Sequence, residues 1–218
     1  MFVYPTQTEY SRAVPKNKIY EYASAKSSLK TMFVEQVDQI VWQYKLAPAT
    51  INLSATSAVT EIQVISIELR TDKLDERVLR AIDKAIPYPL FFELNFGGKY
   101  KTVAAYKRTS DADSTKWVVD SYFASNWLQG DTPREPLPVA LDMEKLYEQM
   151  MRALMPLPAR EGESLKTQVQ RLVELKNKQK EVARLKICLQ REKQFNRKVE
   201  INAQLRNIQN EVNELSTE

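Results

Sequence analysis

The sequence predicts an α+β protein with a small, mostly antiparallel sheet and packed helices, followed by a long C-terminal helical arm of coiled-coil character. Helix-like and strand-like apolar patterns alternate before residue 129, and prolines interrupt the chain twice after that. No glycine or proline follows Gly162. We therefore expect an α/β domain at 1–128, a proline-rich linker at 129–140, a short helix and second break at 141–162, and a basic helical arm at 163–218.

The apolar periodicity predicts the elements of the α/β domain in chain order. Apolar residues at three- and four-residue steps favour a first helix from about Ser27 to Tyr44. The short, β-branched segment 61–69 is typical of a largely buried strand. A second amphipathic helix is expected over 74–86, because its apolar residues keep the helical spacing and Pro87 ends it.

Three further strands are expected after the second helix. Segments 90–94 and 100–106 flank Gly97 and Gly98, a pattern that indicates a β-hairpin around a glycine turn. Segment 117–123 supplies another strand. Because strands joined by short turns pair antiparallel, these segments predict a mostly antiparallel sheet.

The arm is rich in Leu, Glu, Lys, Gln and Arg, all good helix formers. One continuous helix would be about 80 Å long, at 1.5 Å per residue. A helical hairpin is the alternative, and the polar cluster 176–180 is where we expect its turn. The sequence leaves both arrangements open.

An apolar seam runs along the end of the arm. Its residues step by four and three positions, as in a coiled coil: Ile201, Leu205, Ile208, Val212 and Leu215. Phe195 and Val199 lie on another side of the same helix. The seam requires a cover, which could be the rest of the arm folded back, a second copy of the chain or another protein.

The net charge of +4 belongs to the arm. Residues 1–162 carry 20 basic and 20 acidic residues, whereas residues 163–218 carry 12 and 8. Five basic residues interleave with apolar ones and are the candidates for contact with nucleic-acid backbone: Lys186, Arg191, Lys193, Arg197 and Lys198. A basic stripe attracts phosphates without reading sequence, although exposed lysines also simply solvate a helix.

The composition excludes several enzyme classes. The chain has no histidine, which removes Ser-His-Asp catalysis and histidine-containing zinc sites. A single cysteine, Cys188, allows neither an internal disulfide nor a multi-cysteine metal site, and we interpret it as a structural thiol. Four glycines do not assemble a nucleotide-binding glycine loop. We expect no catalytic, cofactor or metal residues.

A metal-dependent nuclease remains the alternative, because carboxylates, lysine and Mg²⁺ suffice for that chemistry. The candidate acids are Glu61, Glu68 and Glu93, and the candidate lysines are Lys99, Lys101 and Lys107. However, Arg70 stands where the lysine of an acid-any-lysine step should be. Charged residues at strand ends more often form solvated edges. A Ser-x-x-Lys spacing at 27–30 has a simpler explanation as a helix start.

Several separated segments resemble a known family. They are Trp42–Asn52, Ile82–Tyr88, Ala104–Lys107 and Glu192–Asn202. Together they look like the bacterial domain-of-unknown-function family numbered four-three-nine-one, and the resemblance spans nearly the whole chain. It implies no established activity, but it implies a genetic context: such proteins are often encoded beside helicases and DNA methyltransferases in restriction-modification or antiviral defence islands.

These observations favour a non-enzymatic accessory subunit of a DNA-processing or phage-defence assembly. We expect a protein partner, such as a helicase or methyltransferase of the same system, or self-association. The predicted partner-binding residues are Phe195, Asn196, Val199, Glu200, Asn202, Leu205 and Ile208. No apolar run approaches the roughly 20 residues of a membrane span, and the first residues lack the pattern of a secretion signal. We therefore expect a cytoplasmic protein.

Overall fold

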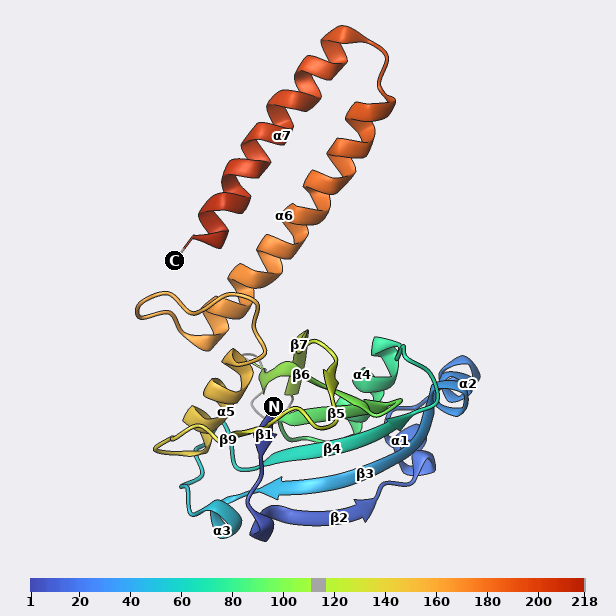
Figure 1. Cartoon of the computed structure of the whole chain (residues 1–218), viewed down its shortest axis with the longest axis vertical. Helices are drawn as coiled ribbons and strands as arrows, with labels where there is room; N and C mark the ends of the chain where they lie inside the picture. Colours follow the sequence, from blue (N-terminus) through green and yellow to red (C-terminus); the bar gives the residue numbers. More distant parts are fainter. Residues whose placement is uncertain (111–116, 218) are drawn as a thin grey trace. The chain divides into compact units, whose positions relative to one another are not determined.

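The computed structural model describes residues 1–110 and 117–217. The chain forms two compact units, Met1–Met155 and Pro156–Glu218. The first unit contains the strands and the shorter helices, and the second contains two long antiparallel helices (Figure 1).

The first unit is built on a seven-stranded sheet in the order β2-β3-β4-β5-β6-β7, with β8 pairing on β6. The strands are β2 (Glu9–Ala13), β3 (Val37–Leu46), β4 (Ile62–Leu69), β5 (Leu90–Phe96), β6 (Lys99–Thr109), β7 (Trp117–Ala124) and β8 (Leu128–Gln129). A separate parallel pair joins β1 (Phe2–Val3) to β9 (Glu135–Pro136). A 3₁₀ helix η1 (Thr6–Thr8) and a short helix α3 (Pro48–Ile51) occupy connections.

The sheet is mixed, which corrects the prediction of a mostly antiparallel one. Strands β4 and β5 run parallel, with Ile65 opposite Phe92. The helix between them, α4 (Glu76–Ala85), carries the chain back along the sheet, so β5 starts at the same edge as β4. The sequence indicated all three elements, but not that they form one β-α-β unit.

The first predicted helix is only half correct. Helix α2 spans Ser27–Gln36, and the chain then continues as β3 instead of as helix. Strand β3 pairs with β2 on one side and with β4 on the other. These two ladders satisfy its backbone groups, and the β-branched residues Val37, Ile40 and Val41 suit a strand. Tertiary pairing therefore overrides the local helical spacing.

The remaining helix and strands predicted for the α/β domain are confirmed. Strands β5 and β6 form the expected hairpin, and Gly97 and Gly98 have φ angles of +58° and +75°. Such angles suit glycine and the two-residue turns of β-hairpins. The predicted strands over 61–69 and 117–123 correspond to β4 and β7.

The two faces of the sheet are covered differently. Helices α1 (Lys16–Tyr22), α2 and α4 enclose the main core on one face, around Phe33, Ile67 and Ile82. On the other face, α5 (Met143–Arg152) places the Tyr147 ring against Phe91 with 6.3 Å between the ring centroids. Because α5 packs on the sheet, the first unit extends to Met155, beyond the boundary at 128 that the sequence suggests.

Candidate nucleic-acid and partner interface

The second unit is a helical hairpin. Helices α6 (Leu165–Arg191) and α7 (Phe195–Ser216) are joined by residues 192–194 (Figure 1). The predicted turn at 176–180 is wrong, because those residues lie inside α6. They are polar but contain no helix breaker. Lys178 instead pairs with Glu211 of α7 across the hairpin.

The apolar seam faces the inside of the hairpin. Its residues Ile201, Leu205, Ile208, Val212 and Leu215 are half-buried, and α7 packs against α6. Helix α6 contributes the buried side chains of Leu172, Leu175 and Leu185. Of the three covers left open by the sequence, the folded-back arm is the one found. Leu205 and Ile208 therefore lie away from the outward face that a partner could reach.

Two arginines, the buried Arg171 and the more exposed Arg160, close the open end of the hairpin. The guanidinium of Arg171 donates to both carboxylate oxygens of Glu163 at 2.8 Å, and to the carbonyl oxygen of Leu215 at 3.1 Å. Arg160 donates to the carbonyl oxygen of Thr217 at 3.1 Å. The last carbonyl groups of α7 thus find cationic partners, as helix C-termini favour. The hydrogen bonds from Arg171 lower the pKa of Glu163 to about 2.

The connection between the helices is held by Glu192. Its carboxylate accepts hydrogen bonds from the backbone N–H groups of Lys193, at 2.7 Å, and Gln194, at 2.9 Å. The hydrogen bonds from the backbone N–H groups of Gln194 and Lys193 lower the pKa of the Glu192 carboxyl group. Arg197 Nε lies 3.8 Å from the other carboxylate oxygen. This acidic group therefore shapes the turn and partly neutralises one arginine.

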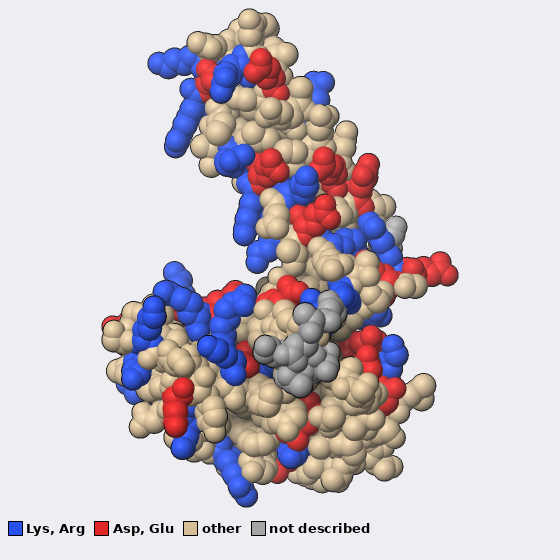
Figure 2. All heavy atoms as spheres, turned by 180° about the vertical axis from the view of Figure 1, so that it is seen from behind, with Lys and Arg blue, Asp and Glu red and all other residues tan. Residues whose placement is uncertain are grey.

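The predicted nucleic-acid residues gather around this connection. We call residues 186–202 the hairpin tip; they contain Lys186, Arg191, Lys193, Arg197 and Lys198. Within the described part of the chain, only Arg197 among these five forms an ion pair with a carboxylate. Figure 2 shows Lys and Arg side chains projecting from this end of the hairpin. The fold thus brings basic residues from two helices to one place.

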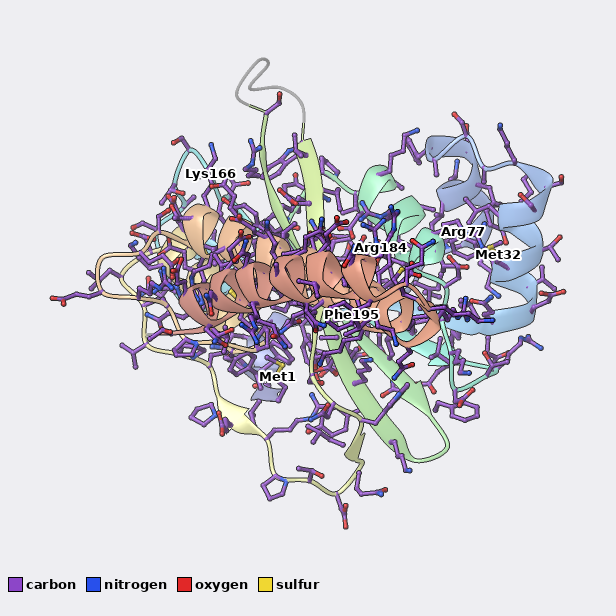
Figure 3. The ribbon with its side chains drawn as sticks, turned by 90° about the horizontal axis from the view of Figure 1, so that it is seen from above. Met1, Met32, Arg77, Lys166, Arg184 and Phe195 are labelled. Carbon is purple, nitrogen blue, oxygen red and sulfur yellow. The ribbon has the colours of Figure 1, made fainter. Side chains whose placement is uncertain are left out.

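Exposed apolar side chains occupy the same tip. Phe195 is 79% exposed, Val199 52% and Ile187 49%. Phe195, Val199 and Asn202 follow each other at four- and three-residue steps, so they share one face of α7. Asn196 and Glu200 are exposed beside them. Phe195 is labelled in the view from above in Figure 3. Five of the seven predicted partner residues are therefore available to a partner.

Cys188 also lies on the tip, where it is free and exposed. This exposure corrects the interpretation as a structural thiol, because the side chain is not packed in the interior.

The carboxylates of the nuclease alternative are separate and mostly paired. Glu61 forms an ion pair with Lys45 at 2.8 Å, and Glu93 binds Arg134 through both oxygens at 2.6 and 3.2 Å. Glu68 is exposed. Across residues 1–110 and 117–217, no group of three or more acidic or cysteine side chains could hold a metal ion.

Two of the lysines considered with those acids stay apart from them, and one arginine has an unexpected partner. Lys107 is buried against Asp83, and Lys101 lies on the opposite sheet face from Glu93. Arg70 pairs at 2.6 Å with Asp38, an acid that the sequence analysis missed. The sequence analysis placed Asp38 inside the helix predicted from Ser27 to Tyr44. In the structure a strand starts at Val37, and Asp38 belongs to it.

The geometry defines an α+β protein whose mixed-sheet domain is followed by a basic helical hairpin. The chain belongs to the family described as "Domain of unknown function (DUF4391)", whose model matches residues 2–212. This match confirms the resemblance read from the sequence. No curated protein and no solved structure matches the chain. Among the described residues, no helix has the length and apolar character needed to cross a bilayer.

Proposed function

We propose that the chain is a non-enzymatic accessory subunit of a bacterial DNA-processing or phage-defence assembly in the cytoplasm. The hairpin tip carries its function: basic side chains contact nucleic-acid backbone, and apolar side chains contact a larger protein partner. The observation that supports this most is the coincidence of both kinds of side chain at residues 186–202.

Contact with the nucleic-acid backbone follows from the charge of the tip. Residues 186–198 hold five basic residues and one acid, Glu192. This acid accepts hydrogen bonds from backbone N–H groups of the turn. Cations without carboxylate partners are free to displace counterions from phosphates, and binding then weakens steeply with salt. Four such cations would give a slope of log K against log salt of about −3 to −4 on duplex DNA.

Contact with a protein partner follows from the outward face of α7. A phenyl ring that is 79% exposed and a valine that is 52% exposed bury little against the chain itself. Aromatic anchors of this kind dominate helix-mediated interfaces, and neighbouring amides such as Asn202 can fix the register. Helix α7 packs against α6, which supports this face from behind.

The decisive experiment removes the tip charges. We replace Arg191, Lys193, Arg197 and Lys198 by Gln and measure binding of fluorescent duplex and single-stranded DNA and RNA at low salt. The matched control replaces four exposed cations outside this cluster, Lys176, Lys180, Arg184 and Arg206, by Gln.

We expect the tip variant to lose most of its affinity and the control variant to retain most of it. Equal affinity of the tip variant and the unmodified protein would reject the backbone contact. Equal losses in both variants would show that only net charge matters and that the tip is no site.

The partner contact has a separate test. Light scattering measures the molar mass of the protein alone and with each protein encoded by neighbouring genes. We expect a complex with one of these proteins. The double variant Phe195→Ser with Val199→Ser should weaken that complex. A complex of unchanged stability in that variant would exclude this face of α7.

A further inference from the structure

A second surface of the first unit forms a cavity of about 620 Å³, which lies in the size range of small-molecule sites. It opens where β4 has ended, beside the start of α4. In sheets with parallel strands, ligands bind at the carboxyl ends of those strands, and β4 and β5 are such a pair. The cavity therefore occupies the place where this topology usually holds a ligand.

The floor of the cavity is apolar. Leu94 of β5 lies opposite Lys101 of β6, and Val103 lies opposite Ala124 of β7, so these residues share one face of the sheet. Leu79 of α4 completes the lining on the helix side. Leu79, Leu94 and Val103 are at most 6% exposed and belong to the main core, so they form a closed apolar floor.

Two aromatic side chains line the cavity. The Tyr122 hydroxyl donates a hydrogen bond to Asp83, and the Arg80 guanidinium lies 5.2 Å from the ring centroid, so this ring is fixed in place. Trp127 follows β7, packs partly buried against the main core and lines the cavity beside Tyr122. Its indole N–H has no hydrogen-bond partner among the described residues. A ring of this kind is a stacking surface for a flat ligand.

Charged groups lie at the edge of the cavity. Neither Lys73 nor Lys101 pairs with a carboxylate in the described part of the chain, and the Asp72 carboxylate accepts no hydrogen bond there. The remaining acid, Glu76, is neutralised by Arg80 at 2.8 Å. As far as the described residues go, the cavity thus offers two cations and one acceptor without charged partners, next to aromatic and apolar surface.

We propose that this cavity binds a nucleotide, either free or as one unit of a single strand. The base stacks on Trp127, the phosphate is held by Lys73 and Lys101, and Asp72 accepts hydrogen bonds from sugar hydroxyl or base amino groups. An apolar peptide side chain would leave all three charges without partners. The inference goes beyond the proposed function, since no hairpin residue takes part in it.

The test uses the full chain carrying the four Gln substitutions at the hairpin tip, so that binding there does not contribute. Calorimetry measures binding of adenosine monophosphate and thymidine monophosphate, and fluorescence anisotropy measures binding of a labelled oligothymidylate. The variants are Trp127→Ala, Trp127→Phe and the pair Lys73→Gln with Lys101→Gln. The matched control is the pair Lys84→Gln with Lys99→Gln, which removes two exposed cations outside the cavity.

We expect Trp127→Ala to weaken binding about tenfold to a hundredfold and Trp127→Phe to restore most of it. The cavity lysine pair should weaken binding clearly more than the control pair. Binding of the monophosphates identifies a free nucleotide, whereas binding of the oligothymidylate alone identifies a strand. Absence of binding by every probe overturns the inference, and so does binding that Trp127→Ala leaves unchanged in a variant with native circular dichroism.

The two proposals can fail separately. Loss of nucleic-acid binding in the tip variant supports the tip contact. Binding of the monophosphates to that same variant still tests the cavity. Cavity variants made in the unmodified chain report on the cavity without altering the tip.

Discussion

The side chain of Lys107 reaches from β6 to the end of α4, where its ammonium group donates to the carbonyl oxygen of Asp83 at 2.8 Å. The ammonium also lies 3.5 Å from the Asp83 carboxylate, and both side chains are at most 1% exposed. Burial lowers the pKa of Lys107 and raises the pKa of Asp83 to about 6. One lysine thus caps the C-terminal end of α4 and ties the helix to the sheet.

Removing this lysine should destabilise the first unit strongly. Lys107→Met leaves the Asp83 carboxylate buried without its cation, and we expect a loss of about 3–5 kcal/mol in the free energy of unfolding. Urea denaturation followed by circular dichroism measures it. The double variant Lys107→Met with Asp83→Asn should lose less, because no unpaired charge remains. A loss below about 1 kcal/mol in the single variant would contradict the role of the pair.

The open end of the hairpin should depend on pH through Glu163. Its pKa is about 2 in the folded chain because of Arg171, against about 4.3 in an unfolded one. This lowered pKa contributes stability that is present above about pH 4 and lost as the pH falls toward 2. We expect Glu163→Gln to lower stability by roughly 2–3 kcal/mol at neutral pH and hardly at all near pH 2.

Thermal unfolding of both proteins across this pH range measures the difference. Glu161→Gln removes a neighbouring exposed acid and serves as the control. A difference between Glu163→Gln and the unmodified protein that stays constant down to pH 2 would show that ionisation of Glu163 is not its source.

The seam residues should stabilise the hairpin itself. Leu205→Ala and Ile208→Ala each remove half-buried apolar surface between α7 and α6, and we expect a loss of about 1–3 kcal/mol apiece. Amide hydrogen exchange of α7 reports the loss as faster exchange. Asn207→Ala, at an exposed position between them, should leave the exchange rates unchanged. Unchanged exchange in all three variants would place the seam outside the hairpin interior.

Phe195 should matter for binding and not for folding. Because its side chain is 79% exposed, Phe195→Ser should change the free energy of unfolding by no more than about 0.5 kcal/mol. The same variant should bind the protein partner more weakly. A large loss of stability would mean that Phe195 packs within the chain, and its exposure would then need another explanation.

The protein should not cleave nucleic acid. Since Glu61 and Glu93 are held by Lys45 and Arg134, we expect no cleavage of DNA or RNA with Mg²⁺ or Mn²⁺. A gel assay with labelled substrates checks this. Cleavage that Glu68→Ala abolishes would replace the accessory role by the nuclease alternative.

Local patterns were sufficient for much of the fold. The buried run at β4 and the glycine turn between β5 and β6 each have a local cause, namely β-branched composition and positive φ angles. The boundary between α2 and β3 has none, because Ile40 suits a helix by spacing and a strand by pairing opposite Ile67. The basic and apolar tip residues could be listed from the sequence, but their meeting required the turn at 192–194.

The sequence by itself determined which residues are available for function: no histidine, one cysteine, and a cluster of cations in the last quarter of the chain. Composition and local spacing suffice for that, since they depend only on neighbours along the chain. The tertiary structure alone decided that the seam folds onto α6, that β4 and β5 run parallel, and that Lys73, Lys101 and Trp127 line one cavity. Contacts between distant residues decide these features, because burial and backbone pairing outweigh local preference.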